Sequence, residues 1–126
     1  MLTPNEVNQY IHLTFKQYSL ADYKVVWKPN LKRVLGAANP WKKQIELSPR
    51  ILASFESFKQ VFLHEVGHIL QFSMMGGTYK TNGRNNFHGK EFKKACKIVG
   101  IPYFRIIPSH LPLASHEQAK KFLTSI

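Results

Sequence analysis

The stretch FLHEVGHIL, residues 62 to 70, decides the fold and the chemistry of this chain. It places His64, Glu65 and His68 inside an apolar run, where an ionisable side chain without a partner is costly to desolvate. Residues four apart on a helix stand one turn apart on the same face, so both imidazoles can reach one ion. Glu65 projects beside that pair, close enough to polarise a water. The spacing H-E-x-x-H therefore predicts two zinc ligands, His64 and His68, and a general base, Glu65.

The helix that carries this motif is expected to be the buried centre of the fold, because apolar residues lie nearly all round it. Ser54 or Ser57 is expected to cap its start, and Ser57 also begins a capping-box pattern. Gly76 and Gly77 are expected to end it. The alternative interpretation of the two histidines is that they are hydrogen-bonded core residues. A metal ion explains two imidazoles and a carboxylate in one core far better.

A catalytic zinc needs a third protein ligand and an open position for water. The metzincin continuation, a glycine and then a histidine on a tight turn, is absent, since Ile, Leu and Gln occupy positions 69 to 71. His88 is the best-placed third ligand: it enters a new helix after a glycine-rich reversal, and Gly89 is expected to leave room at the metal. A helix N-terminus also disfavours the imidazolium form. Glu91 is the main rival. The further candidates are His110, His116 and Glu117.

The first half of the chain is expected to contain one helix and a small sheet. Residues 3–20 have helical spacing of apolar side chains, with Thr3 and Glu6 as a capping box and Pro4 in the first turn. Residues 22–47 contain three strand-like segments joined by short turns. The pattern predicts an α+β fold, with a small three-stranded antiparallel sheet packed on helices.

The second half is expected to contain a polar glycine-rich loop at residues 76–86, a helix at 87–101 and a short terminal helix within 113–126. The length of 126 residues suits one domain with a single hydrophobic core. We expect the core to occupy residues 1–101 and a C-terminal extension to occupy residues 102–126.

Composition limits the cellular locations and partners to be expected. No segment is long and apolar enough to span a bilayer, and the N-terminus lacks the pattern of a secretory signal. The lone cysteine, Cys96, cannot form an internal disulfide and lies on the apolar side of its helix. We therefore expect no membrane partner and a monomer that is not secreted. The expected location is cytoplasmic or nucleoid-associated, and nuclear in a eukaryotic host.

The chain carries 18 Lys and Arg against 7 Asp and Glu, a net charge of +11 that attracts polyanions. A stripe at i, i+3, i+4 and i+7 comprises Lys90, Lys93, Lys94 and Lys97. Lys80 and Arg84 extend the positive area in the preceding loop. The pattern indicates contact with nucleic-acid phosphates, and the alternative is a solvated helix face. Trp27 and Trp41 are candidates for stacking on bases, although burial in the small sheet is the favoured interpretation.

Two segments, LHEVGHILQF at 63–72 and NNFHGKEFKKACKIVGI at 85–101, resemble the SprT-like family of zinc metallopeptidase domains. The segment RVLGAANPWKKQIELSPRIL at 33–52 is similar to the sheet region that precedes the motif in that family. The resemblance implies a zincin-like core with a central HExxH helix and one Zn2+ per chain. By the same resemblance His64, His68 and His88 are the ligands and Glu65 is the base.

The resemblance also implies a function: proteolysis of DNA-bound or DNA-crosslinked proteins. The chain lacks the CxxC pair of the zinc ribbon that many bacterial relatives carry after the peptidase core. The sequence thus predicts a zinc metallopeptidase whose protein substrate is presented on DNA. The first alternative is a metallopeptidase with no DNA role. The second is a non-catalytic, zinc-stabilised DNA-binding module, which Glu65 argues against, because a purely structural site uses four closed ligands and needs no base.

Overall fold

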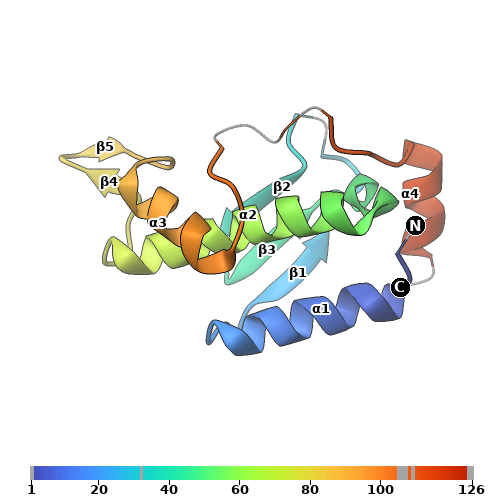
Figure 1. Cartoon of the computed structure of the whole chain (residues 1–126), viewed down its shortest axis with the longest axis horizontal. Coiled ribbons are helices and arrows are strands. Elements are labelled where there is room, and N and C mark those ends of the chain that lie inside the picture. Colours follow the sequence, from blue (N-terminus) through green and yellow to red (C-terminus); the bar gives the residue numbers. More distant parts are fainter. Residues whose placement is uncertain (1, 32, 105–107, 109, 125–126) are drawn as a thin grey trace.

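The computed structural model describes residues 2–31, 33–104, 108 and 110–124. The chain forms an α+β fold, as the sequence predicts (Figure 1). The elements, in chain order, are α1 (Pro4–Gln17), β1 (Lys24–Trp27), β2 (Gly36–Asn39), β3 (Gln44–Leu47), the 3-10 helix η1 (Pro49–Ala53), α2 (Phe55–Met74), β4 (Lys80–Thr81), β5 (Arg84–Asn85), α3 (Lys90–Val99) and α4 (His116–Leu123).

Helix α2 carries the HExxH motif through the middle of the molecule, with the three-stranded sheet, α1 and α3 around it (Figure 1). Its cap is Ser54, whose hydroxyl accepts a hydrogen bond from the backbone N–H of Ser57. Ser57 itself lies inside the helix and is buried, so the expected second capping box is wrong. The helix stops before Gly76 and Gly77, which have the positive φ angles that end helices without Cβ strain.

The three-stranded sheet is mixed, and the expected all-antiparallel arrangement is wrong. The strand order is β1-β3-β2, with β2 antiparallel and β1 parallel to the central strand. A four-residue turn joins β2 to β3 as a hairpin, which is the antiparallel connection that short turns permit. Strand β2 instead lies at the opposite edge of the sheet from β1, which leaves room for β3 between the two earlier strands.

The core lies between α2 and its neighbours. Phe58 and Phe62 of α2 stack on each other, and Phe15 of α1 packs against Phe62. Ile45 and Leu47 of β3 are fully buried. These contacts bury the apolar side of α2 that faces the sheet and α1. They thereby fix the position of the motif helix relative to the sheet and α1.

Helix α1 begins as expected, because Thr3 and Glu6 form a capping box. Of the two tryptophans, Trp27 in β1 is half-buried and packs against the core, close to the favoured interpretation, whereas Trp41 is 70% exposed and contradicts it. Trp41 lies in the turn between β2 and β3, so it is outside the sheet in which we expected it to be buried.

The polar loop contains a small hairpin that the sequence analysis did not predict. Strands β4 and β5 pair around Asn82 and Gly83, both at positive φ, as a two-residue hairpin turn requires. Helix α3 starts at Lys90, three residues later than expected, and ends at Gly100 in the left-handed conformation.

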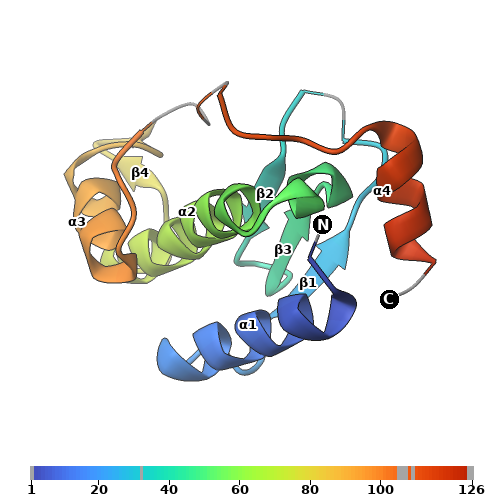
Figure 2. The same cartoon turned by 45° about the vertical axis from the view of Figure 1, so that its right-hand side comes forward.

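The C-terminal extension contains the expected short helix, α4, which packs against η1 (Figure 2). Arg50 of η1 donates from Nε to the carbonyl of Ala114, and the N–H of Ala114 donates back to the carbonyl of Arg50. Residues 105–107, 109, 125 and 126 of this extension lie outside the described residues. None of the described helices combines the length and apolarity that a bilayer crossing requires.

Candidate metal centre

Three imidazoles converge at the middle of α2. His64 and His68 come from successive turns of that helix, and His88 comes from the residues just before α3. One ring nitrogen from each lies within 4.8 Å of the others. The ring centroids are 4.8 Å apart for His64 and His68, 5.0 Å for His68 and His88, and 5.9 Å for His64 and His88. The structure therefore brings together all three histidines that the sequence singled out, and they could hold one metal ion.

The chemical state of these rings suits metal binding. Burial lowers the pKa of His64 to about 3, with further lowering by His68 and His88. Burial also lowers the pKa of His68 to about 4. Both rings are thus neutral at physiological pH, the state in which an imidazole nitrogen can ligate. Nδ1 of His64 is buried without a hydrogen-bond partner among the described residues, a cost that a bound ion would offset. Three imidazole nitrogens are a donor set that zinc accepts.

Gln71 orients His68, the second candidate ligand. Its Oε1 lies 2.9 Å from Nδ1 of His68, and its Nε2 donates to the backbone carbonyl of Asn86 at 2.7 Å. The amide is fully buried and has a partner at each end. Because Gln71 accepts at Oε1, it favours the His68 tautomer with a proton on Nδ1, which leaves Nε2 free for a metal.

Two tyrosine hydroxyls hold the backbone at the ligands. Tyr79 donates to the carbonyl of His68 at 2.7 Å, and Tyr103 donates to the carbonyl of His88 at 2.6 Å. Sequence reasoning missed these roles and that of Gln71. A buried amide three residues after His68, in an otherwise apolar helix, was the one available signal.

Aromatic rings pack around the imidazoles. Phe92 of α3 stacks on His68 with 4.1 Å between ring centroids, and Phe104 stacks on His64 with 5.1 Å between ring centroids. Gly67 permits the first contact, because a Cβ there would lie 3.2 Å from the ring of Phe92. These apolar neighbours contribute to the desolvation that lowers the pKa of His64 and His68.

Gly89 has a different role from the one expected. A Cβ at Gly89 would lie 2.5 Å from the side-chain amide of Asn86, so the missing side chain leaves room for Asn86 rather than for the metal. The backbone carbonyl of Asn86 accepts the hydrogen bond from Nε2 of Gln71, and the backbone N–H of Asn86 donates to the carbonyl of Tyr79. Gly89 thereby lets the loop before His88 fold tightly against α2.

Glu65 is 5% exposed, and burial raises its pKa to about 8. It follows His64 directly on α2 and lies against β2. A Cβ at Gly36 would lie 3.1 Å from Cγ of Glu65. A cation beside a buried carboxylate favours the ionised form, so a metal at the three histidines would counter this rise in pKa.

The other candidate ligands lie outside the cluster of three histidines. Glu91 is half-buried in the first turn of α3, and the remaining three are exposed: His110, His116 and Glu117.

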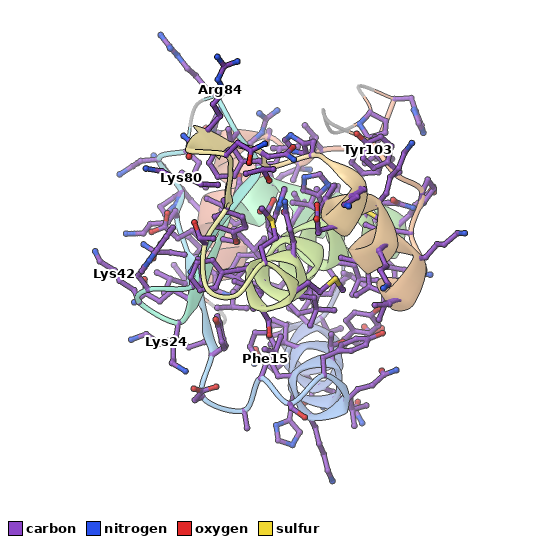
Figure 3. The ribbon with its side chains drawn as sticks, turned by 90° about the vertical axis from the view of Figure 1, so that its left-hand side faces the viewer. Phe15, Lys24, Lys42, Lys80, Arg84 and Tyr103 are labelled. Atoms are coloured by element: carbon purple, nitrogen blue, oxygen red, sulfur yellow. The ribbon has the colours of Figure 1, made fainter. Side chains whose placement is uncertain are left out.

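The predicted basic residues are all exposed. Helix α3 presents Lys90, Lys93, Lys94 and Lys97 to solvent. Its opposite side buries Phe92, Ala95, Cys96 and Val99, as expected. Nζ of Lys93 lies 5.2 Å from the ring centroid of Tyr103, which ties this stripe to the structure around His88. Lys80 and Arg84 project from the β4–β5 hairpin, at the same end of the molecule as α3 (Figures 1 and 3).

Comparison with known families gives one match. The model of the SprT-like family matches residues 5–111, which include the three histidines, Glu65 and Gln71. The match extends past residue 101, where the sequence analysis placed the end of the core. No curated protein and no solved structure matches the chain.

Proposed function

Because the chain belongs to the SprT-like family, we propose that it is a zinc-dependent metallopeptidase acting on proteins bound or crosslinked to DNA. One observation carries the enzymatic part. Nitrogens of His64, His68 and His88 lie within 4.8 Å of one another, and the buried Glu65 is the residue after His64 on the same helix. A metal site built for structure alone has no use for a buried base next to its ligands.

A zinc ion held by the three rings supplies a Lewis acid that polarises a peptide carbonyl and makes water more acidic. Glu65 accepts the proton of the attacking water and then returns it to the leaving amine. Its burial keeps bulk water away from this carboxylate. Gln71 and the two tyrosines hold His68 and His88 in place, so the ligands need little rearrangement during the reaction.

The number of ligands supports an enzyme over a zinc-stabilised binding module. A structural zinc site closes its tetrahedron with four protein ligands, whereas a catalytic site keeps one position open. Among the described residues the cluster contains three, all histidines. The residues outside the described ranges include no His, Cys, Asp or Glu that could serve as a fourth.

The DNA part of the proposal is supported by charge. The net charge is +11, and the exposed lysines of α3 and the cations of the β4–β5 hairpin lie at the end of the molecule that supplies His88. Phosphate contacts made by lysine and arginine release counterions, so we expect affinity for DNA to fall steeply with added salt. Salt-independent binding, or no binding at low salt, would remove this part.

The test is cleavage of a basic DNA-binding protein, with and without DNA, by the zinc-loaded chain. Glu65→Gln is the matched control, because it keeps the ligands and removes the base. We expect DNA-stimulated cleavage by the wild type and none by Glu65→Gln at equal zinc content. Cleavage by the metal-loaded variant would rule out the assigned base. Cleavage that ignores DNA would leave a metallopeptidase with no DNA role.

A further inference from the structure

Trp41 is an exposed aromatic residue in a rigid setting. The indole is 70% exposed, yet it contacts Phe72 of α2 at 5.1 Å and Tyr79 at 6.0 Å between ring centroids. A single exposed aromatic residue is common, but Trp41 extends a group of rings with Phe72 and Tyr79, and contiguous apolar surface of this kind marks sites that bind a partner. The two ring contacts restrain the indole, while most of its surface stays open to a ligand.

The surroundings of Trp41 are positively charged. Lys42 follows Trp41 in the same turn. Lys80, the first residue of β4, follows Tyr79, which contacts the indole, and Arg84 lies on the paired strand β5. Figure 3 shows the side chains of Lys42, Lys80 and Arg84 projecting into solvent along one side of the molecule.

The acidic groups of the sheet region do not neutralise this surface. Residues 21–47 contain two of them, Asp22 and Glu46. Asp22 is paired with Lys43, and Glu46 lies 3.9 Å from Lys28. The surface around Trp41 therefore favours an anionic partner.

We propose that Trp41, Lys42, Lys80 and Arg84 form a binding site for single-stranded nucleic acid. A base stacks on the indole, and the phosphates on either side of it contact the three cations. Stacking requires a base face that is free, and bases within a duplex already cover one another's faces. The site thus selects single strands. The lysine stripe of α3 offers charge alone, which attracts single strands and duplexes alike. This inference rests on the proposed function and adds a preferred form of nucleic acid to it.

A hollow next to Phe72, which contacts the indole of Trp41, supports the same partner. It has a volume of about 610 Å³, and its lining includes the aromatic ring of Tyr23 as well as Phe72. Asp22 and Lys43 also line it, and they pair with each other. A base next to the one on Trp41 has room there, against aromatic groups and this ion pair.

The site is also close to the metal centre. Tyr79 contacts Trp41 on one side and donates its hydroxyl to the carbonyl of His68 on the other. A strand held on Trp41 therefore passes one aromatic residue away from a metal ligand. A protein attached to that strand is thereby delivered to the peptidase centre.

The test compares two oligonucleotides of equal length and charge, oligothymidylate and an abasic sugar-phosphate strand, on the full zinc-loaded chain at low salt. Stacking on one aromatic residue corresponds to about 5- to 150-fold in affinity. We expect Trp41→Ala to weaken oligothymidylate binding by such a factor and to leave binding of the abasic strand unchanged. Trp41→Phe should restore part of the loss. Trp27→Phe, which removes the half-buried tryptophan, is the matched control and should bind like the wild type.

Two further readouts sharpen the result. In the Trp27→Phe background Trp41 is the remaining tryptophan, and its fluorescence should be quenched by oligothymidylate but not by the abasic strand. The double substitution of Lys80→Glu and Arg84→Glu should weaken the binding of both strands. Melting curves for each variant identify any loss that comes from unfolding.

Equal effects of Trp41→Ala on the two strands would overturn the inference, and so would a wild type that binds neither. Polyglutamate binding with the same dependence on Trp41 would point to an acidic protein partner and would also overturn it. Zinc content and Glu65-dependent cleavage are measured on the same preparations. If both persist while Trp41→Ala has no effect, this inference fails alone. If the wild type holds no zinc and cleaves nothing, the proposed function fails.

Discussion

The side-chain amide of Gln71 lies 2.9 Å from Nδ1 of His68, and it is the point where α2 is joined to the loop of the third ligand. The other end of the same amide donates to the carbonyl of Asn86, two residues before His88. One buried side chain thus orients His68 on α2 and restrains the segment that brings His88 to it.

Replacing Gln71 with Leu should therefore weaken zinc binding. Loss of a residue that orients a metal-ligating histidine typically costs about 10- to 100-fold in metal affinity. We expect an effect of this size in competition with a chromophoric chelator. Gln60→Leu is the matched control, because Gln60 is a half-buried glutamine of the same helix whose Oε1 has no partner among the described residues. Equal affinity in the two variants would contradict the role of Gln71.

Zinc should stabilise the chain through His88. A ligand at a hundred times its dissociation constant adds about 2.7 kcal/mol to the free energy of unfolding. We expect a chelator to lower the melting temperature of the wild type and to have no effect on His88→Ala. His110→Ala, at an exposed histidine outside the cluster, should behave like the wild type. A chelator effect that survives His88→Ala would place the metal elsewhere.

Substitution at Gly36 should disturb Glu65. A Cβ there would lie 3.1 Å from Glu65 and from Val61, so Gly36→Val overpacks this contact and should destabilise the fold by about 1–3 kcal/mol. We expect cleavage to fall more than zinc affinity, because the base moves and the ligands do not. Ala37→Val, on the other face of β2, is the control. Normal cleavage by Gly36→Val would argue against close packing at the base.

Cys96 should report on the integrity of the fold. It is 1% exposed, and burial raises its thiol pKa to about 11. At pH 8 the thiolate fraction is then about a hundredfold lower than for a thiol at the ordinary pKa of 9.0. We expect a disulfide reagent to label the native protein slowly, and the urea-unfolded protein at least about a hundred times faster. Rapid native labelling would show that α3 is not packed as described.

The sequence was sufficient to predict the cluster of three histidines, because its signals are local. The helical spacing of His64 and His68 and the capping and apolar pattern around them place both on one buried face. His88 followed from its position at the start of α3. Phe92, by contrast, reaches His68 through packing between α2 and α3, which no local pattern encodes.

The sheet topology was less predictable for a physical reason. Each strand was visible as a segment, but the neighbour of a strand is decided by its connections and by packing against α2. The parallel pairing of β1 with β3 follows from the position of β2 at the other edge of the sheet, an order that no local sequence pattern indicates. The exposure of Trp41 likewise depends on its place in a turn rather than on its residue type.

X-ray absorption spectroscopy at the zinc edge of the loaded chain tests most directly whether three histidines hold one zinc ion with a position left open. We expect one zinc per chain, three imidazole nitrogens and one non-protein oxygen, with one imidazole lost in His88→Ala. A fourth protein ligand, or an unchanged spectrum in His88→Ala, would contradict it.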